Sequence, residues 1–339
     1  MRPLSEMAAA GDMLEQYRSV RSGLGWRDLS GRVKIEVTGP DRVEFLHAVL
    51  CNDVRSLPDF AGRRGALLTP TGKIVADFDY YRLPDSLMID VAAGPAARLT
   101  ELLEGYIIMD DVTLKDVTAR FRHWAFEGPR APEFLRGLLG GPIPEKTRRI
   151  VVMDWEGTDT WLVRKDLLSD SGFELLVPAA KAAELSTEIA QEGRAFGLVE
   201  IGPAAFDILR LERGLPLFGV DFSENNNPLD AQLSDLYSLA KGCYPGQEVL
   251  AKATNIGGVA RLLIKVRMPG PEVPARGTKL RLQGGKEVGW ITSAGFSPFL
   301  QRTLGFAFVK RSAATAGTTL AVEMTKGGTV EGEIVESYL

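Results

Sequence analysis

The chain of 339 residues has few of the residues that bind metals or form disulfides. It contains two cysteines, Cys51 and Cys243, and two histidines, His47 and His123. An iron–sulfur cluster usually takes about four thiolates, and a structural zinc site takes about four Cys or His ligands. We therefore expect no resident metal in one copy of the chain. The wide spacing of the two cysteines also argues against a disulfide framework.

Long apolar runs are missing as well. No segment approaches the ~20 consecutive apolar residues of a membrane-spanning helix, and residues 1–25 lack the apolar stretch of a secretory signal. We therefore expect a cytoplasmic protein that contacts no membrane. The formal net charge is -4 and the pI is about 5.5. Nucleic-acid-binding domains are typically basic, so we expect no direct nucleic-acid partner.

The motifs of several common enzyme classes are absent. Pro70–Ile74 comes nearest to a phosphate-binding loop, but it lacks the upstream glycine and the following Ser or Thr. No GxGxxG follows a predicted strand, and no GxSxG marks a nucleophilic serine. His47 and Cys51 share one face of a predicted helix, but no third ligand accompanies them. We expect both in the core or at its rim.

A mixture of predicted strands and helices fills residues 1–255. Strands are predicted at 33–37, 65–68, 73–82, 87–91, 150–153, 160–164 and 173–177, and helices at 43–50, 95–104, 179–190 and 203–211. The spacing from Gly39-Pro40 to Phe45-Leu46 recurs from Gly128-Pro129 to Phe134-Leu135. This repeat predicts two interleaved α+β subdomains, the second over about residues 118–198. The identity is short, and chance is the alternative explanation.

The sequence pattern changes after Asn255. Six short strands are predicted at 262–267, 278–282, 288–292, 303–309, 320–324 and 329–335, with turns rich in glycine and proline between them. Regularly spaced short strands are typical of a small antiparallel barrel or sandwich. We therefore predict an α+β chain with one region over residues 1–255 and a C-terminal β-barrel domain over residues 256–339.

The most distinctive segment is Lys241-Gly242-Cys243-Tyr244-Pro245-Gly246-Gln247-Glu248. Its two glycines permit tight turns and close approach of the backbone, and Lys241 beside the thiol favours the thiolate. The segment is therefore a candidate loop for a reactive or metal-binding cysteine. The alternative is a glycine-rich connection with a buried, inert cysteine, because most free cysteines simply pack in the core.

This octapeptide resembles the signature of the YgfZ-type folate-binding protein family, K-G-C-[FY]-x-G-Q-E. The motif residues are Lys241, Gly242, Cys243, Tyr244, Gly246, Gln247 and Glu248. That family is related to the glycine-cleavage T-protein, an aminomethyltransferase, and segments 39–54, 171–174, 207–219 and 292–309 resemble the T-protein. The resemblance implies a T-protein-like (GcvT-like) fold of α+β subdomains around a central opening for folate, followed by the barrel.

The resemblance also implies a set of functional residues. The candidates for contact with tetrahydrofolate or another folate are Asp77, Asp170, Glu174, Phe206, Arg210, Asp230 and Tyr244. Cys243 is the candidate catalytic residue, acting in redox chemistry or as a transient metal ligand. Asp170 keeps, in shortened form, the acidic group that pairs with the pterin ring. Asp230 stands where the family usually has glutamate.

Three positions depart from the T-protein pattern. Ala76 stands at the position of the catalytic carboxylate, Ala92 at a folate-contacting asparagine and Phe206 at a folate-contacting arginine. An alanine can neither accept a proton nor pair with an amine, so it is left open whether the chain is an enzyme. Asp77 and Asp79 share one face of their predicted strand. We expect that face to lie in solvent, because charged strand residues are mostly exposed.

Three functions remain under consideration. The first is a folate-binding accessory protein of iron–sulfur cluster assembly or repair, which indirectly supports tRNA modification. Its partners would be folate and either iron–sulfur assembly factors or client iron–sulfur enzymes. The second is a folate-dependent aminomethyltransferase or demethylase that acts on a small amine, a one-carbon transferase in which another acid replaces Ala76. The third is a folate-free scaffold, which Ala92 and Phe206 favour.

Overall fold

The computed structural model describes residues 12–324 and 327–338, which form two compact units. The first unit holds the chain up to Val49 together with Asp53–Gly65 and Phe78–Phe206. The second unit holds Leu50–Asn52, Ala66–Asp77 and the chain from Asp207 onward. The chain therefore passes between the units several times.

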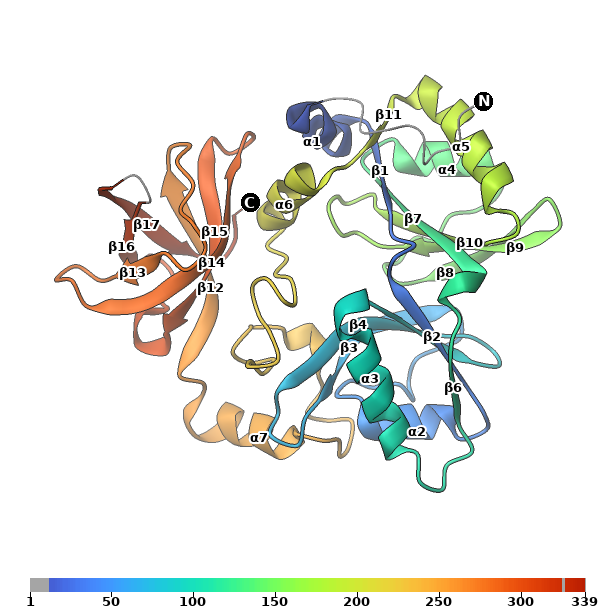
Figure 1. The fold of residues 1–339 in the computed structure, drawn as a ribbon, viewed down its shortest axis with the longest axis horizontal. Helices are drawn as coiled ribbons and strands as arrows, with labels where there is room; N and C mark the ends of the chain where they lie inside the picture. Colours follow the sequence, from blue (N-terminus) through green and yellow to red (C-terminus); the bar gives the residue numbers. More distant parts are fainter. Residues whose placement is uncertain (1–11, 325–326, 339) are drawn as a thin grey trace. The chain divides into compact units, whose positions relative to one another are not determined.

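The first unit contains a six-stranded sheet in the order β11-β1-β7-β10-β9-β8. Its strands are β1 (Leu24–Asp28), β7 (Phe121–Glu127), β8 (Ile150–Trp155), β9 (Thr158–Arg164), β10 (Phe173–Pro178) and β11 (Leu198–Glu200). Helices α4 (Ala131–Leu139) and α5 (Ala182–Phe196) pack on one face of this sheet (Figure 1). Phe126, Phe173 and Leu185 belong to the apolar core between these helices and the sheet. Because β-strand side chains alternate, the strand residues next to these core residues point to the opposite face of the sheet, away from α4 and α5. We call this the charged face.

A five-stranded antiparallel sheet has the order β3-β4-β5-β2-β6. Its strands are β2 (Val33–Thr38), β3 (Ala61–Leu68), β4 (Ile74–Arg82), β5 (Leu87–Val91) and β6 (Thr113–Asp116). In chain order, helix α2 (Arg42–Val49) follows β2 and helix α3 (Ala93–Tyr106) follows β5. Helix α1 (Met13–Ser22) precedes β1, and the Asp12 side chain caps it by accepting a hydrogen bond from Glu15 N. The ends of β3 and β4 that meet at their turn belong to the second unit.

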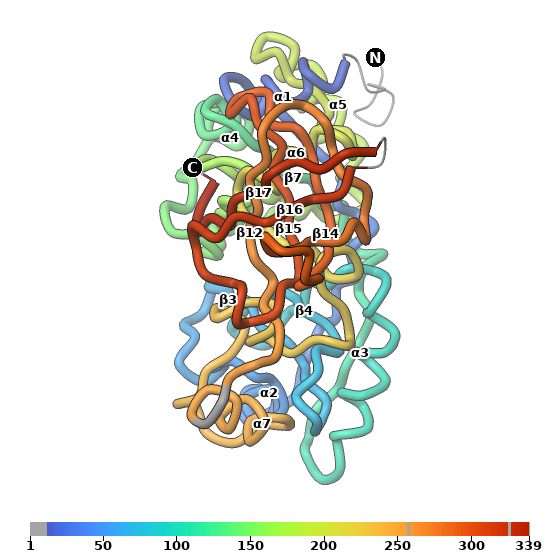
Figure 2. Tube along the Cα trace, turned by 90° about the vertical axis from the view of Figure 1, so that its left-hand side faces the viewer, coloured from blue at the N-terminus to red at the C-terminus, as the bar shows by residue number. Residues whose placement is uncertain are grey.

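The second unit contains a closed six-stranded barrel in the order β12-β15-β14-β13-β16-β17. Its strands are β12 (Arg261–Pro269), β13 (Lys279–Arg281), β14 (Glu287–Ser297), β15 (Arg302–Lys310), β16 (Thr319–Glu323) and β17 (Thr329–Val335). Figure 2 shows β12, β14, β15, β16 and β17 gathered together. Val266, Ile291 and Leu320 fill the barrel interior. Helices α6 (Pro203–Glu212) and α7 (Gln247–Lys252) precede the barrel in the chain.

The predicted α+β fold with a C-terminal antiparallel barrel is confirmed, and each of the six predicted barrel strands is present. The helix predicted at 179–190 instead spans Ala182–Phe196, because a turn with Lys181 N bonded to Pro178 O at 3.0 Å precedes it. Gly197 ends this helix in the left-handed conformation. The domain boundary at Asn255 stays a prediction. No helix of the described chain is long and apolar enough to cross a membrane.

Candidate functional site

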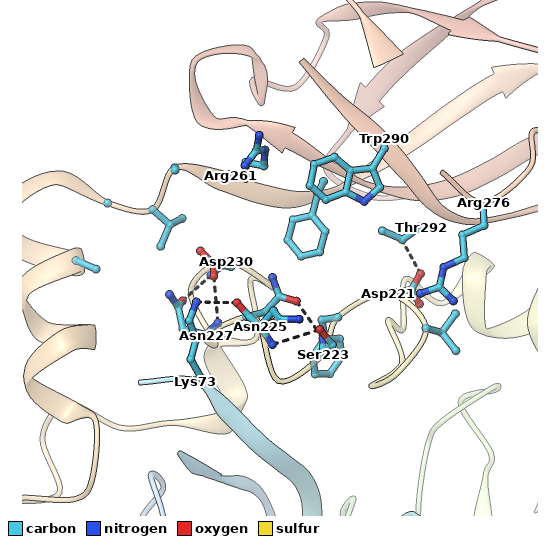
Figure 3. A pocket seen from close by; sticks show the side chains of 18 residues that line it. Lys73, Asp221, Ser223, Asn225, Asn227, Asp230, Arg261, Arg276, Trp290 and Thr292 are labelled. Atoms are coloured by element: carbon cyan, nitrogen blue, oxygen red, sulfur yellow. Dashed lines mark hydrogen bonds between the residues drawn. The ribbon is translucent and has the colours of Figure 1, made fainter. Parts of the chain in front are cut away.

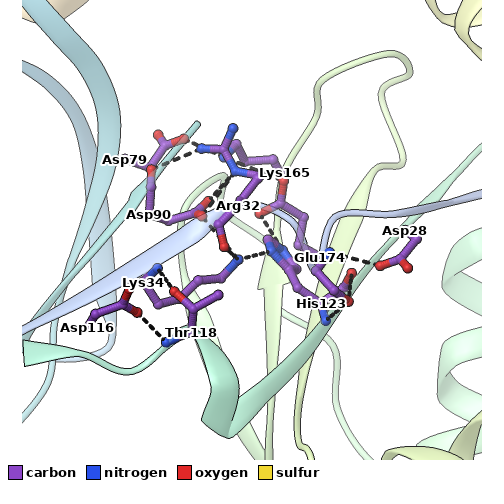
Figure 4. A network of polar contacts seen from close by, with 11 residues as sticks. Asp28, Arg32, Lys34, Asp79, Asp90, Asp116, Thr118, His123, Lys165 and Glu174 are labelled. Atoms are coloured by element: carbon purple, nitrogen blue, oxygen red, sulfur yellow. Dashed lines mark hydrogen bonds and ion pairs between the residues drawn. The ribbon is translucent and has the colours of Figure 1, made fainter. Parts of the chain in front are cut away.

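Asp79, a buried charge on β4, connects the two sheets of the first unit (Figure 4). Arg148 Nε donates to Asp79 Oδ1 at 2.5 Å, and Lys165 Nζ pairs with Asp79 Oδ2. Burial opposes ionisation of Asp79, but Lys165 and Arg148 outweigh it and hold the pKa of this carboxyl well below its usual range. The expectation that this face of β4 lies in solvent is wrong for Asp79, which is 7% exposed, whereas Asp77 is half-buried.

The same network continues to Glu174 and His123. Glu174 lies 3.6 Å from Lys165 Nζ and 3.3 Å from His123 Nε2. Lys34 Nζ lies 2.8 Å from His123 Nδ1 and 3.3 Å from Asp90. Burial lowers the pKa of His123. Because a lysine ammonium only donates, Nδ1 is the acceptor in the contact with Lys34. The predicted folate ligand Glu174 is thus only 4% exposed and engaged with two basic side chains.

The predicted ligand Asp170 lies on the loop between β9 and β10. Glu127, at the end of β7, anchors that loop by accepting hydrogen bonds from Leu168 N at 3.2 Å and Ser169 Oγ at 2.7 Å. Burial raises the pKa of Glu127 to about 7. The Asp170 side chain is exposed. The loop therefore has a fixed backbone and presents an acidic side chain at the surface of the first unit.

The predicted ligand Arg210 lies in the interior of the second unit and is 1% exposed. It donates to Asp207 at 2.7 Å and to Asp221 at 2.8 Å. Asp221 also accepts hydrogen bonds from Thr292 and Ser293 on β14. These contacts connect α6 to the barrel, and they occupy the Arg210 side chain with partners from its own unit.

A pocket of about 630 Å³ lies within the second unit (Figure 3). The barrel contributes Trp290 and Phe308, and the turn between β3 and β4 contributes Lys73. The predicted ligand Asp230 lines this pocket and accepts a hydrogen bond from Asn227 N at 3.1 Å. Burial raises the pKa of Asp230. Polar groups of both signs therefore line the pocket.

The cysteine motif packs against the turn between β3 and β4, within the second unit. A Cβ atom at Gly246 would lie 2.6 Å from Thr69 O and 2.8 Å from Gly72 Cα, and φ at Gly246 is +81°. Only glycine fits these two conditions without strain. Lys241 Nζ lies 4.9 Å from the ring centroid of Tyr244, which is buried. This backbone holds Cys243 with its side chain exposed.

Cys51 and His47 are both buried, as expected. Cys51 is fully buried, with Sγ 3.0 Å from Ala66 O, and burial raises its pKa to about 12. His47 is 7% exposed, and its Nδ1 lies 3.1 Å from Asp53 Oδ1. Across the described part of the chain, no group of three or more His, Cys, Asp or Glu side chains is arranged to hold a metal ion.

Comparison with known proteins gives matches along nearly the whole chain. The model described as "GCVT N-terminal domain" matches residues 6–241, and the "Glycine cleavage T-protein C-terminal barrel domain" matches residues 261–339. The chain belongs to the glycine cleavage T-protein family. The first match alone covers more than half of the sequence.

Relatives of this T-protein-family chain carry the name aminomethyltransferase. One from Koribacter versatilis is 28% identical over 98% of this chain and 88% of its own length. One from Parafrankia sp. is 31% identical over 94% of this chain and 86% of its own length. The crystal structure of glycine cleavage system aminomethyltransferase T from Bartonella henselae has a TM-score of 0.87, covering 96% of this chain and 89% of that chain at 24% identity. This likeness shows the shared T-protein fold.

The predicted folate ligands of this T-protein-family chain fall into two groups. Asp170, Glu174 and Phe206 belong to the first unit, and Asp77, Arg210, Asp230 and Tyr244 belong to the second. Their roles, and membership of the narrower YgfZ-type family, stay predictions. Sequence reasoning missed Glu127, Arg148 and Lys165, and it missed Arg27 on β1, whose guanidinium lies 4.1 Å from the ring centroid of Phe206. The sequence did contain a signal for Glu127. It follows the alternating apolar residues Trp124 and Phe126 along β7, so it lies on the opposite, charged face of that strand.

Proposed function

We propose that the chain binds tetrahydrofolate and takes part in transfer of a one-carbon unit from a small amine, the class of activity for which its relatives are named. The observation that supports this proposal is the family match over both the N-terminal region and the barrel. The relatives named aminomethyltransferase are matched over most of their own length as well.

The residues of the first unit fit a folate. Asp170 presents an exposed carboxylate on an anchored loop, which suits the N–H donors of a pterin ring. Arg27 presents a guanidinium whose buried Nε has no hydrogen-bond partner in the described chain, which suits an anionic group. When bound, tetrahydrofolate supplies the nitrogen atoms that carry the one-carbon unit. The protein side chains bind and orient it.

Ala76 sets this chain apart from an aminomethyltransferase with a catalytic carboxylate. Its methyl group is fully buried on β4. Asp77 is the adjacent acid, but adjacent strand residues point to opposite faces. The methyl group of Ala76 cannot exchange a proton, so we expect turnover to be slow or to depend on a different acid.

A titration of tetrahydrofolate into the purified protein, followed by calorimetry, tests the proposal. We expect a Kd on the order of 10 µM or tighter, unchanged within about twofold in Cys243→Ala because its exposed thiol is not among the predicted folate contacts. Turnover with an aminomethyl donor is then compared between the wild type and Ala76→Asp, with Ala76→Asn as the size-matched control. Absence of any heat of binding in the wild type would disprove the folate proposal.

A second candidate function is the accessory role in iron–sulfur cluster assembly or repair. The observation that favours it is the exposed Cys243 on a loop held by Gly246 against the hairpin turn. An exposed thiol on a fixed backbone suits redox chemistry or transient ligation, with the remaining ligands supplied by a partner.

The accessory role predicts a dependence on Cys243 in cells. Activity of an iron–sulfur enzyme in a strain that lacks this protein is expected to be restored by the wild type but not by Cys243→Ser. Circular dichroism of the purified variant serves as the folding control, because an exposed Cys-to-Ser change should leave the fold intact. Equal restoration by both proteins would rule out a role for the thiol.

A further inference from the structure

Arg27, on β1, has no acid within hydrogen-bond reach of its Nε. This Nε is buried without an acceptor in the described chain, and Glu127 and Glu174 attract the guanidinium only through space. Its guanidinium lies over the ring of Phe206, 4.1 Å from the centroid. Burial lowers the pKa of Arg27, yet an arginine stays charged in proteins. Arg27 is half-buried, and only its Nε is enclosed without an acceptor, so the rest of the guanidinium can meet a ligand from outside the chain.

The sheet directs Arg27 to its charged face. Arg27 pairs with Ala125 across β1 and β7, and Ala125 pairs with Glu174 across β7 and β10. Paired residues in neighbouring strands point to the same face. The small Ala125 therefore separates Arg27 from Glu174, and Glu174 is already engaged by Lys165 and His123.

The other nearby acid does not neutralise Arg27 either. Glu127 shares the charged face, but its two oxygens accept hydrogen bonds from Leu168 N and Ser169 Oγ. Burial raises the pKa of Glu127 to about 7, so near neutral pH this side chain is in part uncharged. The charge of Arg27 is consequently left available to a ligand.

Phe206 links this cation to the predicted folate site. By resemblance to the T-protein, position 206 is that of a folate-contacting arginine, and here it is an aromatic residue. A guanidinium stacks well on an aromatic face, which fixes the plane of its donor atoms. We propose that Arg27 supplies from β1 the guanidinium that position 206 lacks, and that it binds a carboxylate of the glutamyl part of tetrahydrofolate. This inference rests on the proposed function.

The chemistry favours a carboxylate over the pterin. The planar fork of a guanidinium forms two parallel hydrogen bonds with a carboxylate, whereas the pterin ring of tetrahydrofolate carries no anionic group. Phe206 then acts as the platform that orients Arg27. Arg27 is a binding residue that determines which ligands are held.

Calorimetric titrations with tetrahydrofolate and with 6-methyltetrahydropterin, which has no carboxylate, test the inference. Arg27→Met keeps an apolar stem on Phe206 and is expected to weaken tetrahydrofolate binding by on the order of 10–100-fold. It should leave the affinity for the pterin within about twofold. Arg27→Lys retains the charge without the fork and should lie between the two.

The exchange variant with Arg27→Phe and Phe206→Arg gives the sharper result. In this variant the guanidinium comes from α6 and the aromatic ring from β1, so the same two groups stand at the same two positions. We expect it to recover most of the affinity for tetrahydrofolate that Arg27→Met loses. Equal tetrahydrofolate binding by wild type and Arg27→Met would overturn the inference and leave the proposed function standing. A wild type that binds no tetrahydrofolate would overturn both.

Discussion

Asp79→Ala is expected to lower the free energy of unfolding by about 3–5 kcal/mol. The carboxylate is the shared anion of Lys165 and Arg148, and both it and Lys165 are almost fully buried. Its removal leaves the almost fully buried Lys165 with Glu174 at 3.6 Å and takes one partner from Arg148, whose side chain is 25% exposed. An uncompensated buried charge is among the most costly defects that a single substitution produces.

Urea unfolding followed by circular dichroism measures this effect, with Asp85→Asn as the control because Asp85 is an exposed carboxylate. The control should change the free energy of unfolding by less than about 0.5 kcal/mol. The lowered pKa of Asp79 gives a second readout. Its stabilising effect is fully present above the ordinary aspartate pKa of about 4 and is lost as the pH falls through the lower folded-state value. A loss below about 1 kcal/mol would show that Lys165 and Arg148 do not depend on Asp79.

Gly246→Ala is expected to lower the free energy of unfolding by about 2–5 kcal/mol. Two costs add at this position. The backbone has a φ of +81°, and a Cβ would come within 2.6 Å of a backbone oxygen on the opposite turn. The turn and the cysteine loop must then move apart.

Gly242→Ala is the matched control. Gly242 also has a positive φ, +107°, but nothing lies within 4 Å of the Cβ that would be added. This variant therefore carries only the conformational cost of about 1–2 kcal/mol. The difference between the two variants in thermal or urea unfolding isolates the contact with the hairpin turn. If the two variants lose the same stability, that contact contributes nothing.

Local sequence patterns were sufficient for most of the fold. Short segments separated by turns rich in glycine and proline predicted the six barrel strands. Local reasoning failed at Asp79, since a charged strand residue is normally exposed and its partners Arg148 and Lys165 lie far along the chain. Pairing at such distances depends on tertiary structure and leaves no local pattern.

The candidate site was less accessible from sequence. The motif around Cys243 was found because it resembles a family signature, and the structure adds that the thiol is exposed. Arg27 was missed because no motif marks it. Its contact with Phe206 joins the first strand to the last residue of the first unit. Comparison of single residues with a family pattern predicts that position 206 has lost an arginine, but it gives no indication of the replacement from β1 that we propose.

The hairpin tip at residues 66–77 has a consequence for the order of events during synthesis. Its apolar residues Leu68 and Ile74 pack in a cluster with Leu211, Phe222 and Leu304 of the second unit. At ribosomal rates these partners emerge on the order of ten seconds later. We therefore expect the nascent chain to carry this apolar tip without those partners for that time, which exposes the tip to chaperone capture or aggregation.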